Sequence, residues 1–202
     1  MMRPGNRGLR GICLVAAGLI MIASPAARGQ TPVTANSIAE RLGVLETAPD
    51  LNLAAIHQRA ADRIKARAKT DAAPLKRPPI AEELVELPKI LVEVRFDPDS
   101  AIVRPESYQT LGLIADAMVR ATMLPYVFLI VGRTESTGKR DYNLTLSQRR
   151  ADSIRDVLVN TFKISSKRLQ TLGLGEEQLL DANQPAAAIN QRVAIVTIAK
   201  AP

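Results

Sequence analysis

The sequence contains very few of the side chains that carry metal, covalent or aromatic chemistry. Its 202 residues include one cysteine, one histidine, no tryptophan and only 3% aromatic residues. His57 has no cysteine and no carboxylate cluster at ligand spacing, so the sequence predicts no metal site, no cofactor and no histidine-based dyad. Ser147 and Ser153 have no histidine in the same expected domain to activate them. These scarcities argue against an enzyme.

Positive charge is also scarcer than the overall composition suggests. The chain has 27 basic and 20 acidic residues, a net charge of +7. Four arginines lie within the first 29 residues, and without that segment 23 basic residues stand against 20 acidic ones, or +3. A mildly basic chain with few aromatic side chains lacks the charge and the stacking surface that nucleic acids require. The sequence therefore predicts no nucleic-acid partner.

The apolar run near the N-terminus is short. It extends from Ile12 to Ala23, whereas about 20 apolar residues are needed to cross a bilayer. Arginines lie on both sides of it and acidic residues are absent, which is typical of a signal peptide. We predict that residues 1–29 are a signal peptide cleaved before Gln30, with Ala26 as an alternative end and an uncleaved anchor as the rival interpretation. Cys13 lies too early in the run for lipidation, so the mature chain would contain no cysteine.

Residues 30–88 are predicted to be a helical arm followed by a proline-rich basic linker. Asn36 or Ser37 is expected to cap a helix through Leu45, and a second helix is expected from residue 49 to about residue 69. The apolar stripe of the second helix is thin and mostly alanine. A solvated or loosely packed helix is therefore favoured over a partner-binding arm. The proline-rich residues 72–79 mark the domain boundary.

Residues 89–200 are predicted to form one α+β domain. Strands are expected at 89–96, 126–131, 169–172 and 192–198, with helices from Pro105 to about Thr122 and after Asn143. This β-α-β-α-β order predicts a two-layer fold with helices on one face of a small mixed sheet. The other face is expected to be partly open or covered by the loop of residues 181–189.

Two opposite charges are expected to meet where the second strand ends and the next helix begins. Glu135 follows the strand, and Arg150 lies two turns into a helix that Asn143 is expected to cap. A ligand with an ammonium and a carboxylate would fit this pair, with its carboxylate on the planar guanidinium fork. The alternative is a plain Glu135–Arg150 surface salt bridge. Arg150 borders the apolar stripe of its helix, formed by Leu144, Ser147, Ala151, Ile154 and Leu158.

The residues around this turn follow the pattern G-x-T-[acid]-x-T-G and then N-x-x-L-S-x-x-R-A, from Gly132 to Ala151. The pattern resembles the signature of the OmpA C-terminal domain-like family, of the OmpA, MotB and Pal type, which binds peptidoglycan in Gram-negative envelopes. Further elements of the family are matched in the same order by V-R-F-D-P-D-S at 94–100, R-P-E-S-Y-Q at 104–109, G-L-G-E at 173–176 and N-Q-R-V at 190–193.

The resemblance implies that the ligand is the diaminopimelate of the peptidoglycan stem peptide, whose side chain ends in one ammonium and one carboxylate. Glu135 stands where the family has an aspartate that is one methylene shorter. Arg133 replaces the usual histidine, and Gln191 replaces the first arginine of N-R-R-V. The implied ligand-binding residues are Glu135, Arg150, Asn143, Thr134, Asp97, Ser147 and Arg192.

The resemblance also implies a non-catalytic protein of the periplasm, associated with the outer membrane or the cell wall of a Gram-negative bacterium. Its expected role is to tether the envelope to the wall. The alternative is an OmpA-like scaffold that has lost wall binding and engages a protein partner. Residues 50–80 include a basic run, for which two interpretations stay open: a contact with an envelope protein or an anionic membrane surface, and a solvated helix face, which is the more common case. A homodimer is left open.

Overall fold

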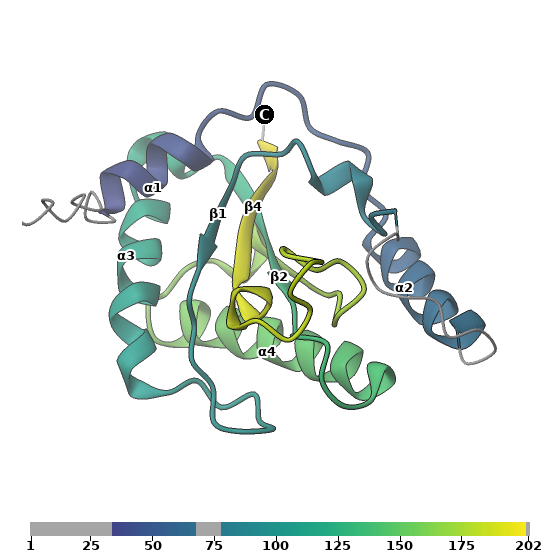
Figure 1. The fold of residues 1–202 in the computed structure, drawn as a ribbon. Coiled ribbons are helices and arrows are strands. Elements are labelled where there is room, and N and C mark those ends of the chain that lie inside the picture. Colours follow the sequence, from purple (N-terminus) through teal and green to yellow (C-terminus); the bar gives the residue numbers. More distant parts are fainter. Residues whose placement is uncertain (1–33, 68–77, 201–202) are drawn as a thin grey trace, which may run out of the picture. The chain divides into compact units, whose positions relative to one another are not determined.

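The computed structural model describes residues 34–67 and 78–200, which belong to one compact unit (Figure 1). The predicted signal peptide, residues 1–29, lies outside the described residues, as does most of the proline-rich stretch. Among the helices of the described residues, none combines the length and the apolar character that crossing a membrane would require.

The domain is built on a four-stranded mixed sheet. Its strands are β1 (Lys89–Val92), β2 (Tyr126–Gly132), β3 (Leu169–Gly173) and β4 (Val193–Lys200), in the spatial order β1-β4-β2-β3. β4 pairs antiparallel with both β1 and β2, whereas β2 and β3 are parallel. The predicted α+β fold with a mixed sheet is confirmed, and the last strand of the chain lies between β1 and β2. β2 is apolar along its length because both of its faces are covered.

Three helices pack on one face of the sheet and share a core with it: α1 (Ala35–Leu42), α3 (Tyr108–Met118) and α4 (Arg140–Asn160) (Figure 1). The predicted stripe of α4 is confirmed, because all five of its members are buried. α3 ends at Met118, before the predicted Thr122, and a separate 3-10 turn (Ala121–Met123) follows it. α1 is capped by Thr34 in a capping box with Ser37, two or three residues earlier than predicted.

The opposite face of the sheet is covered by α2 (Leu53–Arg67) and a short 3-10 helix (Glu82–Leu84). Ile56 and Ala60 of α2 are 1% and 0% exposed. The expectation of a solvated or loosely packed helix is therefore wrong. The thin stripe is sufficient because the partly buried side chains of Leu53 and Ile64 widen it. α2, and not the loop of residues 181–189, covers the face that was expected to be partly open.

The loop after β1 carries polar residues towards the ends of β2 and α4. β1 ends at Val92, four residues before the predicted end, and the chain continues to an isolated bridge between Phe96 and Val103. Within this hairpin the Asp97 amide donates to the Ile102 carbonyl at 3.1 Å. The hairpin therefore holds Asp97 and the residues that follow it against the start of α4.

Candidate functional site

A cavity of about 420 Å³ lies between the β1 hairpin, the loop after β2 and the first turns of α4. Both members of the predicted charge pair, Glu135 and Arg150, line it. Thr134, Asn143 and Asp97 line it as well. The structure thus brings five of the seven predicted site residues to one cavity. Its remaining lining residues are Phe96, Pro98, Asp99, Arg104, Thr137, Gly138, Tyr142, Leu146 and Gln191.

Glu135 reaches the cavity because β2 ends at a glycine. A Cβ at Gly132 would lie 2.2 Å from the backbone oxygen of Ser147, so only glycine lets the end of the strand pack this closely on α4. The Glu135 side chain is half-buried, and its Oε1 accepts a hydrogen bond from the Thr137 hydroxyl at 3.3 Å. Within residues 34–67 and 78–200 it forms no ion pair. Its carboxylate therefore keeps its charge uncompensated at the cavity wall.

Arg150 is held by its Nε and by its flat face. The Nε donates to the Ser100 carbonyl at 3.0 Å, and the guanidinium lies over the Phe96 ring at 4.8 Å from the centroid. No hydrogen bond or ion pair in the described part of the chain engages its two terminal nitrogens, Nη1 and Nη2. The salt bridge that was the alternative interpretation is therefore not formed.

Burial lowers the pKa of Arg150, while the charges of Tyr142, Asp99 and Glu135 raise it. The guanidinium has an ordinary pKa far above neutrality, so it stays charged. Glu135 and Arg150 line the same cavity, and no salt bridge joins them among the described residues. An opposed and unpaired charge couple is thus available to a ligand.

Thr134 adds an unsatisfied polar atom to the same wall. The residue is only 3% exposed, and its backbone amide donates to the Gly175 carbonyl at 3.0 Å. Its Oγ1 is buried and has no hydrogen-bond partner among the described residues. Because leaving a buried hydroxyl unpaired costs about 1–3 kcal/mol, this atom favours an occupant that can bond to it.

Asn143 lines the cavity but does not cap the helix, so that prediction is wrong. α4 begins at Arg140 and Lys139 is its N-cap residue. The Asn143 side-chain amide instead donates to the backbone carbonyls of Thr137 and Glu135, at 2.8 and 3.4 Å. It therefore fixes the loop that carries Glu135, from one turn inside the helix.

Asp97 is half-buried, and one of its oxygens lies 3.9 Å from Arg104. Tyr142, which the motifs did not include, and Asp99, which lies in the matched segment 94–100 but was not among the predicted site residues, complete this side of the rim. There the Tyr142 hydroxyl donates to the Asp99 carbonyl at 3.1 Å. Asp99 has a positive φ of 49°. The D-P-D sequence signals a turn here, but not its contact with a tyrosine 43 residues away.

Ser147 and Arg192 do not line this cavity. The Ser147 hydroxyl is fully buried, donates to the Leu144 carbonyl and accepts from the Gly175 amide, both at 2.8 Å. It thereby joins α4 to the loop after β3. Arg192 is exposed and lines an adjoining cavity of about 280 Å³ together with Arg95 and Arg104. The two cavities share Phe96, Arg104 and Gln191.

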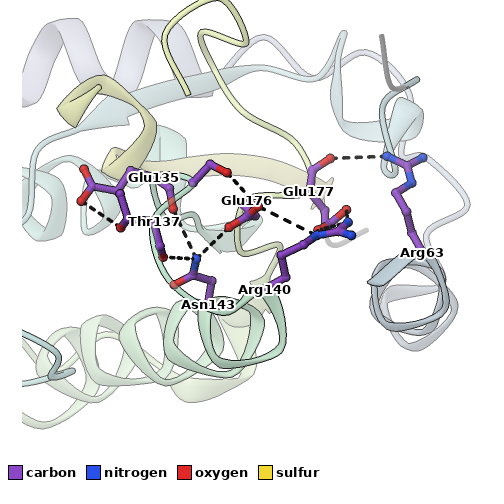
Figure 2. A network of polar contacts seen from close by, with 8 residues as sticks. Arg63, Glu135, Thr137, Arg140, Asn143, Glu176 and Glu177 are labelled. Carbon is purple, nitrogen blue, oxygen red and sulfur yellow. Dashed lines mark hydrogen bonds and ion pairs between the residues drawn. The ribbon is translucent and has the colours of Figure 1, made fainter. Parts of the chain in front are cut away.

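A buried polar layer supports the loop that carries Glu135 (Figure 2). Glu176 accepts hydrogen bonds from the Ser136 hydroxyl and the Asn143 amide, both at 2.8 Å. Glu177 accepts two from the Arg140 guanidinium, at 2.8 and 2.5 Å. Of these five residues, the motif comparison identified Asn143 and Glu176, and it assigned no support role to either. Among the described residues, no group of three histidine, cysteine or acidic side chains could hold a metal ion.

Comparison with known proteins identifies this region. Residues 95–192 match the model of the OmpA family. Outer membrane porin F of Pseudomonas aeruginosa is 35% identical over 112 residues, which are 54% of this chain and 31% of that protein. The peptidoglycan-associated lipoprotein of Brucella melitensis biotype 1 is 36% identical over 83 residues, or 41% of this chain and 48% of that one. The matches thus span about a third to a half of these relatives' own length.

A solved structure, that of the cell wall anchor of the T6SS from Pseudomonas aeruginosa, is 27% identical and has a TM-score of 0.46. The similarity covers 74% of this chain and 98% of that one. Residues 95–192 match the OmpA family and lie in a mixed sheet with packed helices, so this part of the chain forms an OmpA C-terminal-like domain, as its sequence motifs predicted.

Proposed function

We propose that the cavity binds the zwitterionic end of diaminopimelate in the peptidoglycan stem peptide, and that the protein thereby attaches to the cell wall. The observation that carries this proposal is that Glu135 and Arg150 line one cavity with opposite charges and are not paired with each other. A ligand that presents an ammonium and a carboxylate a short distance apart satisfies both charges at once. The role is binding and not catalysis.

Each end of the ligand has a defined partner. Because the Nε of Arg150 is occupied by Ser100, the ligand carboxylate would take the fork formed by Nη1 and Nη2. The ammonium would face the Glu135 carboxylate, whose Thr137 hydrogen bond limits its rotation. The unpartnered hydroxyl of Thr134 is available to either group. A glutamate at position 135 extends one methylene further into the cavity than an aspartate would, so the ligand would lie correspondingly nearer the opposite wall.

The adjoining cavity accommodates the rest of the stem peptide in this proposal. Arg192 has no ion-pair partner within the part of the chain that the structure describes, and Arg104 lines both cavities. A second carboxylate of the stem, beyond the diaminopimelate side chain, would meet these two arginines. Two of the similar proteins bear names of the outer membrane or of peptidoglycan. Their names support a place in the periplasm, at the outer membrane or the wall.

The test is co-sedimentation of the full chain with purified sacculi, together with calorimetry using a diaminopimelate tripeptide. We expect Arg150→Ala to weaken binding about 10- to 100-fold, because a charge-assisted hydrogen bond contributes about 1.5–3 kcal/mol. Glu135→Ala should be similarly weak, and Glu135→Asp should bind as well as the wild type or better. Arg149→Ala is the matched control, because Arg149 is the exposed neighbour in the same helix.

Ligand chemistry supplies a second control. Lysine-type sacculi have the ammonium of the stem side chain but lack its carboxylate, so they should not retain the protein. Equal retention on both wall types would contradict the role of Arg150. Absence of sedimentation for the wild type would refute wall binding and favour a scaffold that engages a protein partner.

A further inference from the structure

Helix α2 packs directly against the elements that carry the candidate site. Ile56 and Ala60 belong to one buried cluster with Leu144 of α4, Leu172 of β3 and Leu174 of the following loop. Leu144 is the residue after Asn143, and Leu174 precedes the Glu176–Glu177 pair by two residues. The apolar contacts of α2 therefore involve residues that are close in sequence to Asn143, Glu176 and Glu177 of the polar layer.

A polar path connects α2 to that layer (Figure 2). The Arg63 guanidinium donates to the Pro78 carbonyl at 2.9 Å and to the Glu177 carbonyl at 3.4 Å. The Glu177 side chain in turn holds Arg140, the first residue of α4, through two hydrogen bonds. One side chain of α2 thus touches both the chain that returns from α2 and the loop after β3.

The loop after β3 then fixes the loop that carries Glu135. The two oxygens of the Glu176 carboxylate hold Ser136 and Asn143, and Asn143 holds the carbonyls of Thr137 and Glu135. The two hydrogen bonds of Glu176 join residues that are 33 and 40 positions apart in the sequence. A displacement of the Glu176–Glu177 loop would therefore move the backbone on both sides of Ser136.

The chain that returns from α2 makes a second connection, through Gln178. The Ala81 amide donates to the Gln178 side-chain oxygen at 3.0 Å, and the Arg133 Nε donates to the Gln178 carbonyl at 3.2 Å. Arg133 is 6% exposed, and its Nη1 has no hydrogen-bond partner within residues 34–67 and 78–200. Residues 78–84 are thus tied, through one glutamine, to a residue two positions before Glu135.

We infer that residues 51–67 and 78–84, here called the docked segment, position the binding cavity and are more than a spacer. The docked segment holds the loop of residues 174–178, and that loop holds Glu135 in place for the ligand's ammonium. The inference rests on the proposed function for its ligand, but it goes beyond the family match, which begins at residue 95. Release of the docked segment would lower affinity without removing any residue that lines the cavity.

The first test needs no ligand. Ile56→Asp introduces a charge into the buried contact of α2, and Ala54→Asp introduces the same charge at an exposed position of the same helix. Amide hydrogen exchange is followed by NMR at Thr134 and Ser136, whose amides donate to Gly175 and Pro185. We expect exchange about tenfold faster in Ile56→Asp, and within about twofold of wild type in Ala54→Asp.

The amides of α1 serve as the internal control, because α1 packs on the other face of the sheet. They should be unchanged in both variants. If Ile56→Asp also accelerates exchange of the α1 amides, the whole domain is destabilised. The variant Arg63→Ala then serves as the test of the inference, since it adds no buried charge. We expect about threefold faster exchange at Ser136 in Arg63→Ala. Unchanged exchange at Ser136 in Arg63→Ala would overturn the inference. Unchanged exchange at Thr134 and Ser136 in Ile56→Asp, in a protein whose α2 amides exchange faster, would overturn it as well.

Calorimetry with the diaminopimelate tripeptide completes the experiment. Affinity about tenfold weaker in Ile56→Asp than in Ala54→Asp supports positioning by the docked segment. Equal affinity in the two variants overturns it and leaves wall binding intact. If the wild type does not bind the tripeptide, the proposed function fails, and the ligand-free exchange still decides whether the docked segment positions the loop.

Discussion

Replacement of the buried Arg133 by methionine should stabilise the protein at neutral pH. Burial lowers the pKa of Arg133 from its ordinary, much higher value to about 10. At about 1.4 kcal/mol per pKa unit, this difference corresponds to roughly 3 kcal/mol of unfavourable charge burial. The variant also loses the hydrogen bond from Nε to Gln178, which contributes about 1.5–3 kcal/mol for a charged donor. We expect a net gain of about 1 kcal/mol in the free energy of unfolding of Arg133→Met.

Urea denaturation at pH 7 measures this gain, with Arg120→Met as the matched control. Arg120 is exposed, so its replacement should change the free energy of unfolding by less than about 0.5 kcal/mol. A loss of more than about 1 kcal/mol in Arg133→Met would refute the reasoning, because it would show that the hydrogen bond outweighs the cost of burying the charge.

The pH dependence provides an independent check of the same cause. A lowered pKa means that the folded protein binds fewer protons than the unfolded chain in the window that begins at about pH 10 and ends at the ordinary pKa of arginine. The free energy of unfolding of the wild type therefore gains from this group as pH rises through that window. The variant lacks the contribution, so its advantage should shrink above pH 10. An advantage that grows instead would show that Arg133 is stabilised by its surroundings.

Three further predictions concern stability. Gly132→Ala should lower the free energy of unfolding, measured by urea denaturation, by several kcal/mol, since its Cβ would overlap a backbone oxygen. Gly138→Ala should lower it by only about 1 kcal/mol, because its φ is +79° but its Cβ would point into open space. The pKa of Glu177 is raised, and burial is the largest cause. Its contribution to the free energy of unfolding is therefore fully present below about pH 4.5 and is lost as pH rises through the raised pKa. Glu177→Gln should remove this decline, and an unchanged pH profile would contradict it. Arg168 donates to three backbone carbonyls 42 to 50 residues away. Arg168→Lys should therefore lower the free energy of unfolding by about 2 kcal/mol, which is seen as a lower melting temperature. An unchanged melting temperature would argue against a stabilising role of these hydrogen bonds.

Local patterns in the sequence predicted most of the sheet and the helices on its first face. The apolar run of β2, the stripe of α4 and the turn with Gly132 and Gly138 each have a periodicity or a residue type that follows from backbone geometry. The same patterns placed Glu135 and Arg150 at one cavity, because a strand and the helix after it bring their adjacent ends together.

Contacts between distant segments left no such local signature. The docking of α2 depends on two buried residues, Ile56 and Ala60, and on an arginine that reaches a carbonyl 114 residues away. Asn143 has the residue type of a helix cap, but its amide finds acceptors in the preceding loop and on Glu176. In both cases the tertiary partner decided between two locally reasonable roles.

The carboxylates near the cavity differ in how far their charge is already satisfied. Glu177 is paired with Arg140, and Glu176 accepts from Asn143 and a serine hydroxyl, so both are committed to the buried layer. Glu135 accepts only from the Thr137 hydroxyl among the hydrogen bonds of the described chain. Since Arg140 is already engaged, it does not compete with a ligand's ammonium for Glu135. The Glu135 carboxylate therefore has no ion pair among the described residues, and in the proposed function it is the group that would face the ligand's ammonium.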